Sequence, residues 1–198
     1  MTPPLVLASN NAHKLEEVGR MLEPLGIDVR PLAEFPDVPE PPETAETFEE
    51  NALQKARFVF ERTGLPTIAD DSGLEVDALD GAPGVHSKRF TPEATANSNN
   101  ARLLLELDGE HQRAARFVCA LALVTTSGER TVRGTVEGEI ATTPRGKGGF
   151  GYDPLFLPTE APGKTMAELT PSEKDTISHR GRALRELPAM LSSLQSES

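Results

Sequence analysis

The sequence predicts an α/β fold built on a mixed central β-sheet with helices on both faces. In the first third of the chain, short apolar runs alternate with amphipathic segments of helical spacing, which implies at least one right-handed βαβ unit and therefore parallel strands. Farther on, two long β-prone runs joined at Ser127-Gly128 predict an antiparallel hairpin. The chain has 198 residues, of which 37% are apolar, enough for a real core, so we expect a single domain over residues 1–198.

Each element of this alternation has a local basis in the sequence. Strands are indicated by short apolar runs, and helices by apolar residues three or four apart that lie between a capping side chain and a glycine. We predict a strand at Leu5–Ala8, a helix capped by Ser9–Asn11 and ended by Gly26, a strand at Ile27–Leu32, a helix from Thr47 to Gly64, a strand at Thr67–Ala69, a helix at Asn99–Leu107, strands at Ala115–Thr125 and Thr131–Ala141, a helix from Arg180 with a kink at Pro188, and a frayed tail at Ser192–Ser198.

Charge and composition exclude several classes of protein. The formal net charge of -11 and the isoelectric point near 4.9 argue against general affinity for a nucleic-acid backbone, so any basic site must be local. Neither a basic secretory leader nor an apolar run long enough to span a bilayer is present, so we expect no membrane partner. Because Cys119 is the only cysteine, no internal disulfide can form, and a cytoplasmic location is expected.

Two adjacent carboxylates, Asp70 and Asp71, follow an apolar run just before Gly73, where we expect the chain to turn. Carboxylates at the end of a strand commonly hold a divalent cation over a phosphate. Neighbouring residues of an extended chain point to opposite faces, so one of the two should face a ligand. An ordinary Asp-Ser-Gly turn is the alternative. Glu43 and Glu46, in an acidic proline-rich loop, could add oxygen ligands or simply be hydrated.

Three further segments carry polar groups suited to an anionic, flat ligand. The first strand-to-helix junction offers backbone N–H groups and Lys14 to an anion, although this segment taken alone favours an ordinary helix cap followed by a solvated lysine. On the second helix, Asn51 and Lys55 are four residues apart and share a face, so Lys55 could neutralise a phosphate. Within Gly146–Pro154 the glycines allow close backbone approach beside Phe150, although such a segment can also merely connect strands.

The residues just before the last predicted helix supply three potential cations, Lys174, His179 and Arg180. Phosphate and carbonyl oxygens are natural partners for such groups. A helix start capped by Ser178 accounts for the same segment and is compatible with a binding role.

Taken together, these motifs resemble the inosine/xanthosine triphosphate pyrophosphatase family. The resemblance spans Leu5 to about Leu187, and Ala45 stands where the family often has glycine. Six separate motifs in the same order argue against a chance resemblance. The motifs are Ser9-x-Asn11-x-x-Lys14-x-x-Glu17, Thr47-Phe48-x-x-Asn51-Ala52-x-x-Lys55-Ala56, Ala69-Asp70-Asp71-Ser72-Gly73-Leu74, Gly81-Ala82-Pro83-Gly84-Val85, Gly148-Gly149-Phe150-Gly151-Tyr152-Asp153-Pro154 and Ser178-His179-Arg180.

The resemblance implies a fold of two lobes with a central cleft, and a homodimer. It implies hydrolysis of deaminated purine nucleoside triphosphates (ITP, dITP, XTP) to the monophosphate and pyrophosphate, with Mg²⁺ as cofactor. Asp71 is then the proton acceptor and, with Glu43, a metal ligand. Phe150 stacks on the base, and His179 or Arg180 donates to its 6-oxo group. The implied substrate-binding residues are Ser9, Asn10, Asn11, Ala12, His13, Lys14, Ser72, Phe150, Gly151, Tyr152, Asp153, Lys174, His179 and Arg180.

Two other functions stay open at this stage. A related pyrophosphatase could act on other modified nucleotides, and a panel of triphosphates would distinguish it. A nucleotide sensor without catalytic activity is the other alternative. The paired carboxylates Asp70 and Asp71 argue against a sensor, because a plain anion receptor gains nothing from carboxylates facing phosphate unless a metal intervenes.

Overall fold

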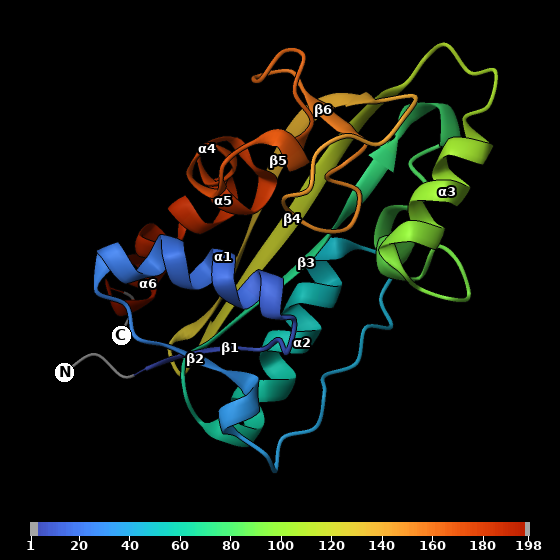
Figure 1. The fold of residues 1–198 in the computed structure, drawn as a ribbon. Coiled ribbons are helices and arrows are strands. Elements are labelled where there is room, and N and C mark those ends of the chain that lie inside the picture. The colour runs from blue at the N-terminus through green and yellow to red at the C-terminus, as the bar shows by residue number, and fades with distance from the viewer. Residues whose placement is uncertain (1–3, 197–198) are drawn as a thin grey trace. The chain divides into compact units, whose positions relative to one another are not determined.

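A computed structural model describes residues 4–196 and contains one six-stranded mixed sheet with the strand order β2-β1-β3-β4-β5-β6 (Figure 1). Helices accompany the strands along the chain, as the sequence predicts. The strands are β1 (Leu5–Leu7), β2 (Val29–Pro31), β3 (Thr67–Val76), β4 (Ala114–Thr125), β5 (Gly128–Ile140) and β6 (Phe156–Pro158). The helices are α1 (Ala12–Leu22), α2 (Phe48–Thr63), α3 (Ala96–Glu106), α4 (Pro171–Ile177), α5 (His179–Arg185) and α6 (Leu187–Ser196).

Contacts divide the chain into two units. Unit 1 takes its described residues from 1–71, 119–134 and 180–198, and unit 2 consists of residues 72–118 and 135–179. The long strands β3, β4 and β5 each contribute one part to each unit. Two units agree with the two expected lobes, whereas the expectations of a single domain and of a central cleft stay predictions.

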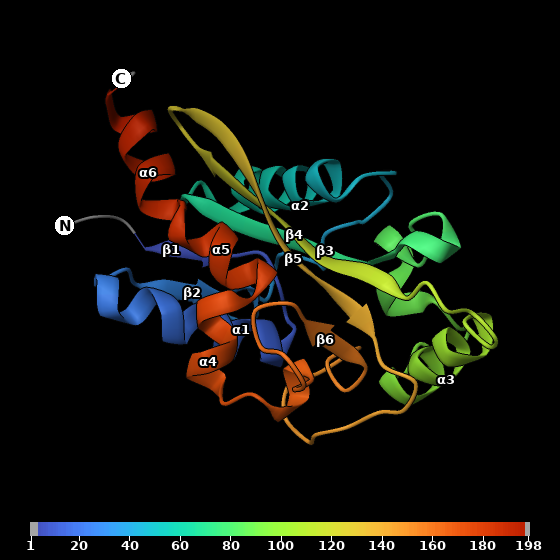
Figure 2. The same ribbon diagram turned by 90° about the horizontal axis from the view of Figure 1, so that it is seen from above.

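In unit 1, β1 lies between β2 and β3 and pairs in parallel with both, with Val6 opposite Arg30 and Thr67. This confirms the parallel portion that the alternating elements predicted. One face of these strands packs against α1, α5 and α6 through an apolar cluster that includes Leu7, Ile68 and Leu184. Helix α2 covers the opposite face (Figure 2).

Unit 2 contains the second core and the antiparallel part of the sheet. Strands β5 and β6 pair antiparallel, with Ile140 opposite Phe156. The ring of Phe156 lies 4.5 Å from that of Phe117, centroid to centroid, within a cluster that also receives side chains from α3. Strands β4 and β5 are neighbours joined by a two-residue turn, and so short a connection allows only the antiparallel hairpin that the sequence predicted.

The third strand is longer than predicted. It was expected to end at Ala69 and turn at Gly73, but β3 continues without a turn to Val76. Asp, Ser and Gly have low β-propensity, yet Asp70 and Asp71 have little exposed surface, because neighbouring strands and packed helices hold this segment extended. The two carboxylates therefore lie in the middle of a strand and not at its exit.

The carboxyl-terminal part also differs from the prediction. The single helix with a kink at Pro188 is two helices, α5 and α6, and Pro188 is the second residue of α6, where its missing N–H breaks no intrahelical bond. The predicted frayed tail belongs to α6 as far as Ser196, since Leu194 is buried in the core of unit 1. Residues 197–198 of that tail lie outside the described residues.

Two glycines give a matched test of this packing. A Cβ at Gly138 would lie 2.3 Å from the carbonyl oxygen of Leu157, whereas a Cβ at Gly19, inside α1, would meet nothing within 4 Å. Gly138→Ala should lower the free energy of unfolding by about 1–3 kcal/mol through overpacking. Gly19→Ala should raise it by about 0.5–1 kcal/mol through helix propensity. Urea denaturation measures both changes, and a Gly138→Ala variant as stable as the unmodified chain would contradict the close pairing of β5 with β6.

Candidate active site

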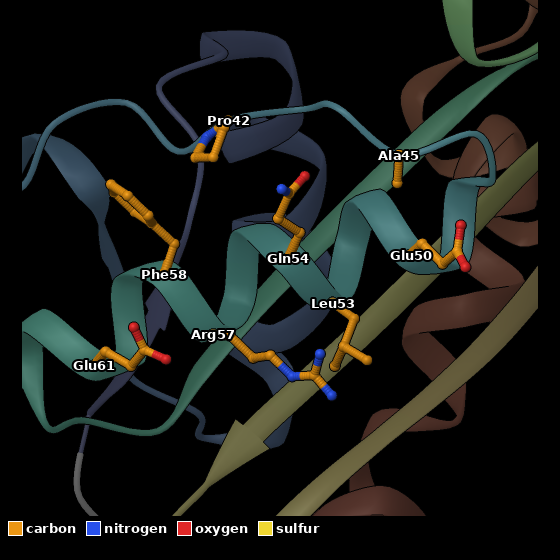
Figure 3. Close-up of a pocket in the computed structure, with 8 residues that line it drawn as sticks. All are labelled: Pro42, Ala45, Glu50, Leu53, Gln54, Arg57, Phe58 and Glu61. Carbon is orange, nitrogen blue, oxygen red and sulfur yellow. The ribbon is translucent and has the colours of Figure 1, made fainter.

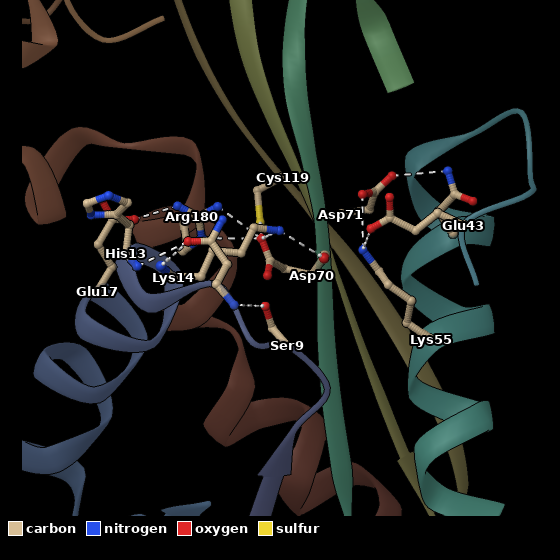
Figure 4. A network of polar contacts seen from close by, with 12 residues as sticks. Ser9, His13, Lys14, Glu17, Glu43, Lys55, Asp70, Asp71, Cys119 and Arg180 are labelled. Atoms are coloured by element: carbon tan, nitrogen blue, oxygen red, sulfur yellow. Dashed lines mark hydrogen bonds and ion pairs between the residues drawn. The ribbon is translucent and has the colours of Figure 1, made fainter. Parts of the chain in front are cut away.

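The two adjacent aspartates of β3 lie on opposite faces of the strand. Asp70 is 3% exposed and Asp71 is 7% exposed, so both carboxylates are buried. Alternation along the strand directs Asp70 toward α1 and α5 and directs Asp71 toward α2, as Figure 4 shows. The sequence predicted this division, and it means that the two carboxylates have separate sets of partners, all of them in unit 1.

Asp71 is held by two side chains of α2. The Nζ atom of Lys55 lies 3.1 Å from Asp71 Oδ1, and Asn51 donates from Nδ2 to Asp71 Oδ2 over 3.1 Å. The same Nζ atom also donates to Glu43 Oε1 over 2.7 Å (Figure 4). One ammonium group therefore joins the two carboxylates that the family resemblance implies as metal ligands.

The start of α2 fixes this arrangement. The Thr47 hydroxyl caps the helix by accepting from the backbone N–H of Glu50, and four-residue spacing then places Asn51 and Lys55 on one buried face. The acidic loop before the helix brings Glu43 to the same face, with its side chain one-third exposed.

Burial and charge act on these groups in opposite directions. Burial raises the pKa of Asp71 above its usual value, although Lys55 and Lys14 act to lower it, while Glu43 adds to the increase. Burial acts to lower the pKa of Lys55, but Asp71, Asp70 and Glu43 outweigh it, so the net shift is upward. Lys55 therefore stays cationic, and Asp71 is a more basic carboxylate than an exposed aspartate.

Asp70, on the other face, is the centre of a buried ion-pair network. Its Oδ2 atom lies 3.0 Å from Lys14 Nζ and 3.0 Å from Arg180 Nη2, and Cys119 Sγ lies 3.9 Å from it. Arg180 also binds Glu17 of α1 and is 2% exposed. Burial acts to lower the pKa of Arg180, but Asp70 and Glu17 outweigh this effect, so the net shift of the pKa is upward. The guanidinium is therefore a permanent cation held by two carboxylates.

The first strand-to-helix junction is an ordinary cap in this structure. Asn11 accepts from the N–H groups of His13 and Lys14, and Ser9 accepts from the N–H of Asn11. These bonds occupy N–H groups that we expected to be available to an anion, so the role of the junction as an anion cradle stays a prediction. Burial lowers the pKa of Lys14, partly offset by Asp70. Asn10, Ala12 and His13 are exposed beside it.

Glu43 and Asp71 have the chemistry that a magnesium ion requires. Both offer hard carboxylate oxygens, and both already share a cation, the Lys55 ammonium. Across residues 4–196, no group of three or more His, Cys, Asp or Glu residues is placed to hold a metal. Proteins usually bind Mg²⁺ through one or two carboxylates together with water and substrate phosphates.

In unit 2, the glycine-rich segment forms a tight turn braced by one carboxylate. Asp153 Oδ2 accepts from the backbone N–H of Phe150 over 2.8 Å and from Lys174 Nζ over 2.7 Å. A Cβ at Gly149, where φ is +67°, would lie 2.0 Å from this oxygen, so only glycine fits there. The Lys174 ammonium lies 4.8 Å from the centre of the Phe150 ring, a cation–π distance. Three residues predicted to bind the base are thus brought together.

The remaining predicted residues have other neighbours. Tyr152 is buried, and its hydroxyl donates to the carbonyl oxygen of Ser87 over 2.9 Å, so its side chain contributes to the core of unit 2. The Gly151 carbonyl accepts from Asn100 Nδ2. His179 stacks on Phe117 with ring centres 4.9 Å apart. Ser72 follows Asp71 in β3 and is partly exposed. The binding roles of these residues stay predictions.

Several residues of the site were not assigned from sequence. Asp70 and Glu17 bind Arg180, Cys119 contacts Asp70, and Asn51 binds Asp71. The sequence spacing could have indicated two of them. Glu17 lies three residues after Lys14, and Asn51 lies four residues before Lys55, so each pair shares one face of its helix.

Comparisons with known proteins agree with the motifs. The model of the Ham1 family matches residues 5–190. A dITP/XTP pyrophosphatase of an Exiguobacterium strain is 55% identical over 187 residues, which cover 93% of this chain and 95% of that protein. A dITP/XTP pyrophosphatase of Mycolicibacterium paratuberculosis is 52% identical and covers 96% of this chain and 97% of its own.

Solved structures give the same result for the fold. A HAM1 protein from Coxiella burnetii has a TM-score of 0.87 and 44% identity, covering 98% of this chain and 100% of its own. A nucleoside-triphosphatase, or dITP/XTP pyrophosphatase, from Mycobacterium abscessus has a TM-score of 0.75 and 48% identity, covering 93% and 98%. The α/β fold and the family resemblance are thereby confirmed, and the chain belongs to the Ham1 family.

Proposed function

We propose that this protein hydrolyses the deaminated purine nucleoside triphosphates ITP, dITP and XTP to the monophosphate and pyrophosphate, removing them from the nucleotide pool. Relatives with about half of their residues identical bear the name dITP/XTP pyrophosphatase. The structural observation that carries the proposal is the buried Asp71 carboxylate, which shares the Lys55 ammonium with Glu43. Such a group combines a basic carboxylate with oxygen ligands for a cation that would offset phosphate charge.

Asp71 is proposed as the proton acceptor of the reaction. A water molecule adds to the α phosphorus, the bond from that phosphorus to the oxygen bridging the α and β phosphates breaks, and pyrophosphate leaves with that oxygen. Asp71 takes the proton that the water loses. Burial raises the pKa of Asp71, which makes its carboxylate a stronger base. Lys55 orients it at Oδ1, and Lys14 supplies a second cation in unit 1.

Glu43 and Asp71 are proposed to hold Mg²⁺. When bound, the ion supplies positive charge that offsets the charge of the phosphate oxygens. The hard-oxygen donors of these two residues and the shared Lys55 ammonium support this assignment.

Recognition of the base is assigned to the glycine-rich turn and to residues 174–180, as the family resemblance implies. Phe150 offers a flat ring next to the Lys174 ammonium, and Asp153 holds both in place. His179 or Arg180 is proposed to donate to the 6-oxo group, which distinguishes hypoxanthine and xanthine from adenine.

The remaining proposals concern location and partners. We propose a homodimer in the cytoplasm, with a purine nucleoside triphosphate as ligand and with neither a nucleic-acid polymer nor a membrane as partner. The family resemblance supports the dimer. The net charge of -11 argues against general nucleic-acid binding, and no helix within residues 4–196 has the length and apolarity needed to cross a bilayer.

The identity of the products tests this function. Purified protein is incubated with ITP, dITP, XTP, ATP and GTP, with and without Mg²⁺, and pyrophosphate is measured separately from orthophosphate. We expect pyrophosphate from the first three nucleotides, only when Mg²⁺ is present. Orthophosphate as the direct product would mean that a different bond is broken, preference for another modified nucleotide would favour the related pyrophosphatase, and binding without turnover would favour a sensor.

Replacing Asp71 tests its role in the chemistry. Asp71→Asn keeps the shape of the side chain but removes its charge and basicity, so kcat for ITP should fall by at least about 100-fold, the usual contribution of a general base. Asp108→Asn, at an exposed aspartate in the turn after α3, is the matched control and should keep full activity. Full turnover by Asp71→Asn, with an unchanged circular dichroism spectrum, would remove Asp71 from this role.

Replacing Phe150 tests base stacking. Because stacking of a base on an aromatic ring contributes roughly 1–3 kcal/mol, Phe150→Leu should raise KM for ITP about ten-fold with little change in kcat. The matched control is Phe58→Leu, which removes a ring that lies 3.5 Å from the Arg62 guanidinium on α2. Steady-state kinetics should show no change for this control, and an equal rise of KM in both variants would argue against stacking at Phe150.

A further inference from the structure

We propose that Asn51 is a positioning residue that fixes the orientation of Asp71 and, at the same time, the place of the loop that carries Glu43. The inference rests on the proposed function, because it concerns the two carboxylates assigned to the metal. Asn51 itself has no charge and is only 1% exposed, so it acts through its neighbours and is not assigned a contact with substrate.

A single amide group makes three hydrogen bonds in this position. Asn51 Oδ1 accepts from the backbone N–H of Ala45 over 2.9 Å. Its Nδ2 atom donates to the carbonyl oxygen of Ala45 over 3.3 Å and to Asp71 Oδ2 over 3.1 Å. Asn51 thus connects the loop before α2, the helix itself and the central strand β3.

These bonds require an amide of this length. Aspartate could still accept from the N–H of Ala45, but it has no donor for Asp71 or for the Ala45 carbonyl. An apolar or shorter hydroxyl side chain would leave the partly buried backbone groups of Ala45 and the buried Asp71 carboxylate without these partners, which is costly. The amide that donates to Asp71 is also uncharged. It therefore sets the direction of the carboxylate and leaves its negative charge available to Mg²⁺.

A second amide, Gln54, holds the same loop by an independent contact. Its Oε1 atom accepts from the backbone N–H of Thr44 over 3.1 Å, and its Nε2 atom donates to Thr44 Oγ1 over 2.9 Å. Figure 3 shows Gln54 directed from α2 toward the loop between Pro42 and Ala45. Within residues 4–196, Gln54 forms hydrogen bonds only with Thr44, so this amide binds the loop and not Asp71.

The two amides therefore separate two effects. Gln54 stabilises the loop alone, whereas Asn51 stabilises the loop and also orients Asp71. Glu43 directly precedes Thr44 and Ala45, the two residues that these amides hold, and its carboxylate accepts from Lys55 over 2.7 Å. The position of this carboxylate therefore depends on where the loop lies. Residues that hold metal ligands in place usually change metal affinity by about 10–100-fold when they are replaced.

The experiment compares Asn51→Ala with Gln54→Ala in the full chain. Affinity for Mn²⁺, used as a spectroscopic substitute for Mg²⁺, is measured by electron paramagnetic resonance without nucleotide, and hydrogen exchange is followed at residues 43–46. For Asn51→Ala we expect an increase of about ten-fold in the Mn²⁺ dissociation constant and a fall of about ten-fold in kcat for ITP, with KM nearly constant. Gln54→Ala should speed hydrogen exchange in the loop but change Mn²⁺ affinity less than about two-fold.

Each outcome decides a different point. Equal Mn²⁺ affinity in Asn51→Ala and the unmodified chain would overturn the inference, as would equal losses in both variants, which would reduce the effect to the loop alone. If the unmodified chain binds no Mn²⁺, the metal assignment of the proposed function fails. In that case, unchanged hydrogen exchange at residues 43–46 in Asn51→Ala would also overturn the proposal that Asn51 holds the loop in place. If Asn51→Ala is not recovered folded, Asn51→Ser takes its place with the same expectations.

Discussion

The structure of the site depends on one constraint, the burial of two adjacent carboxylates in the middle of a central strand. Asp70 and Asp71 cannot share partners, because alternation along β3 turns them to opposite faces. Each must therefore be compensated by cations on its own side, since an unpaired buried charge is very costly. Lys14 and Arg180 fulfil this on one face and Lys55 on the other, so the placement of α1, α5 and α2 in unit 1 is tied to these two residues.

Such a network is not explained by stability. Replacing a buried ion pair with apolar side chains of similar volume is often neutral or stabilising, so folding alone gives no reason to bury so many charges around β3. The apolar cluster between the strands and helices α1, α5 and α6 already provides a core for unit 1. A chemical role accounts for the charges better, because strongly perturbed ionisable groups concentrate at functional sites.

Sequence reasoning recovered what local rules determine. Period-two alternation correctly separated Asp70 from Asp71, and four-residue spacing placed Asn51 beside Lys55. The extension of β3 beyond Ala69 was missed because Asp, Ser and Gly disfavour strands, and only neighbouring strands keep this segment extended. The pairing of Arg180 with Asp70, 110 residues away, depends on tertiary packing and has no local pattern. Helix α4 could have been predicted, since Thr170 and Glu173 form a capping box before it.

The two faces of β3 also differ in charge, and this difference supports a division of labour between the aspartates. Around Asp70, two carboxylates face two cations, because Asp70 and Glu17 pair with Lys14 and Arg180. The Asp71 and Glu43 carboxylates share the Lys55 ammonium, so these three groups together carry one net negative charge. A balanced set has little attraction for a further ion, whereas the excess negative charge beside Asp71 favours a divalent cation. The Asp70 side thus suits a rigid support, and the Asp71 side suits the reaction.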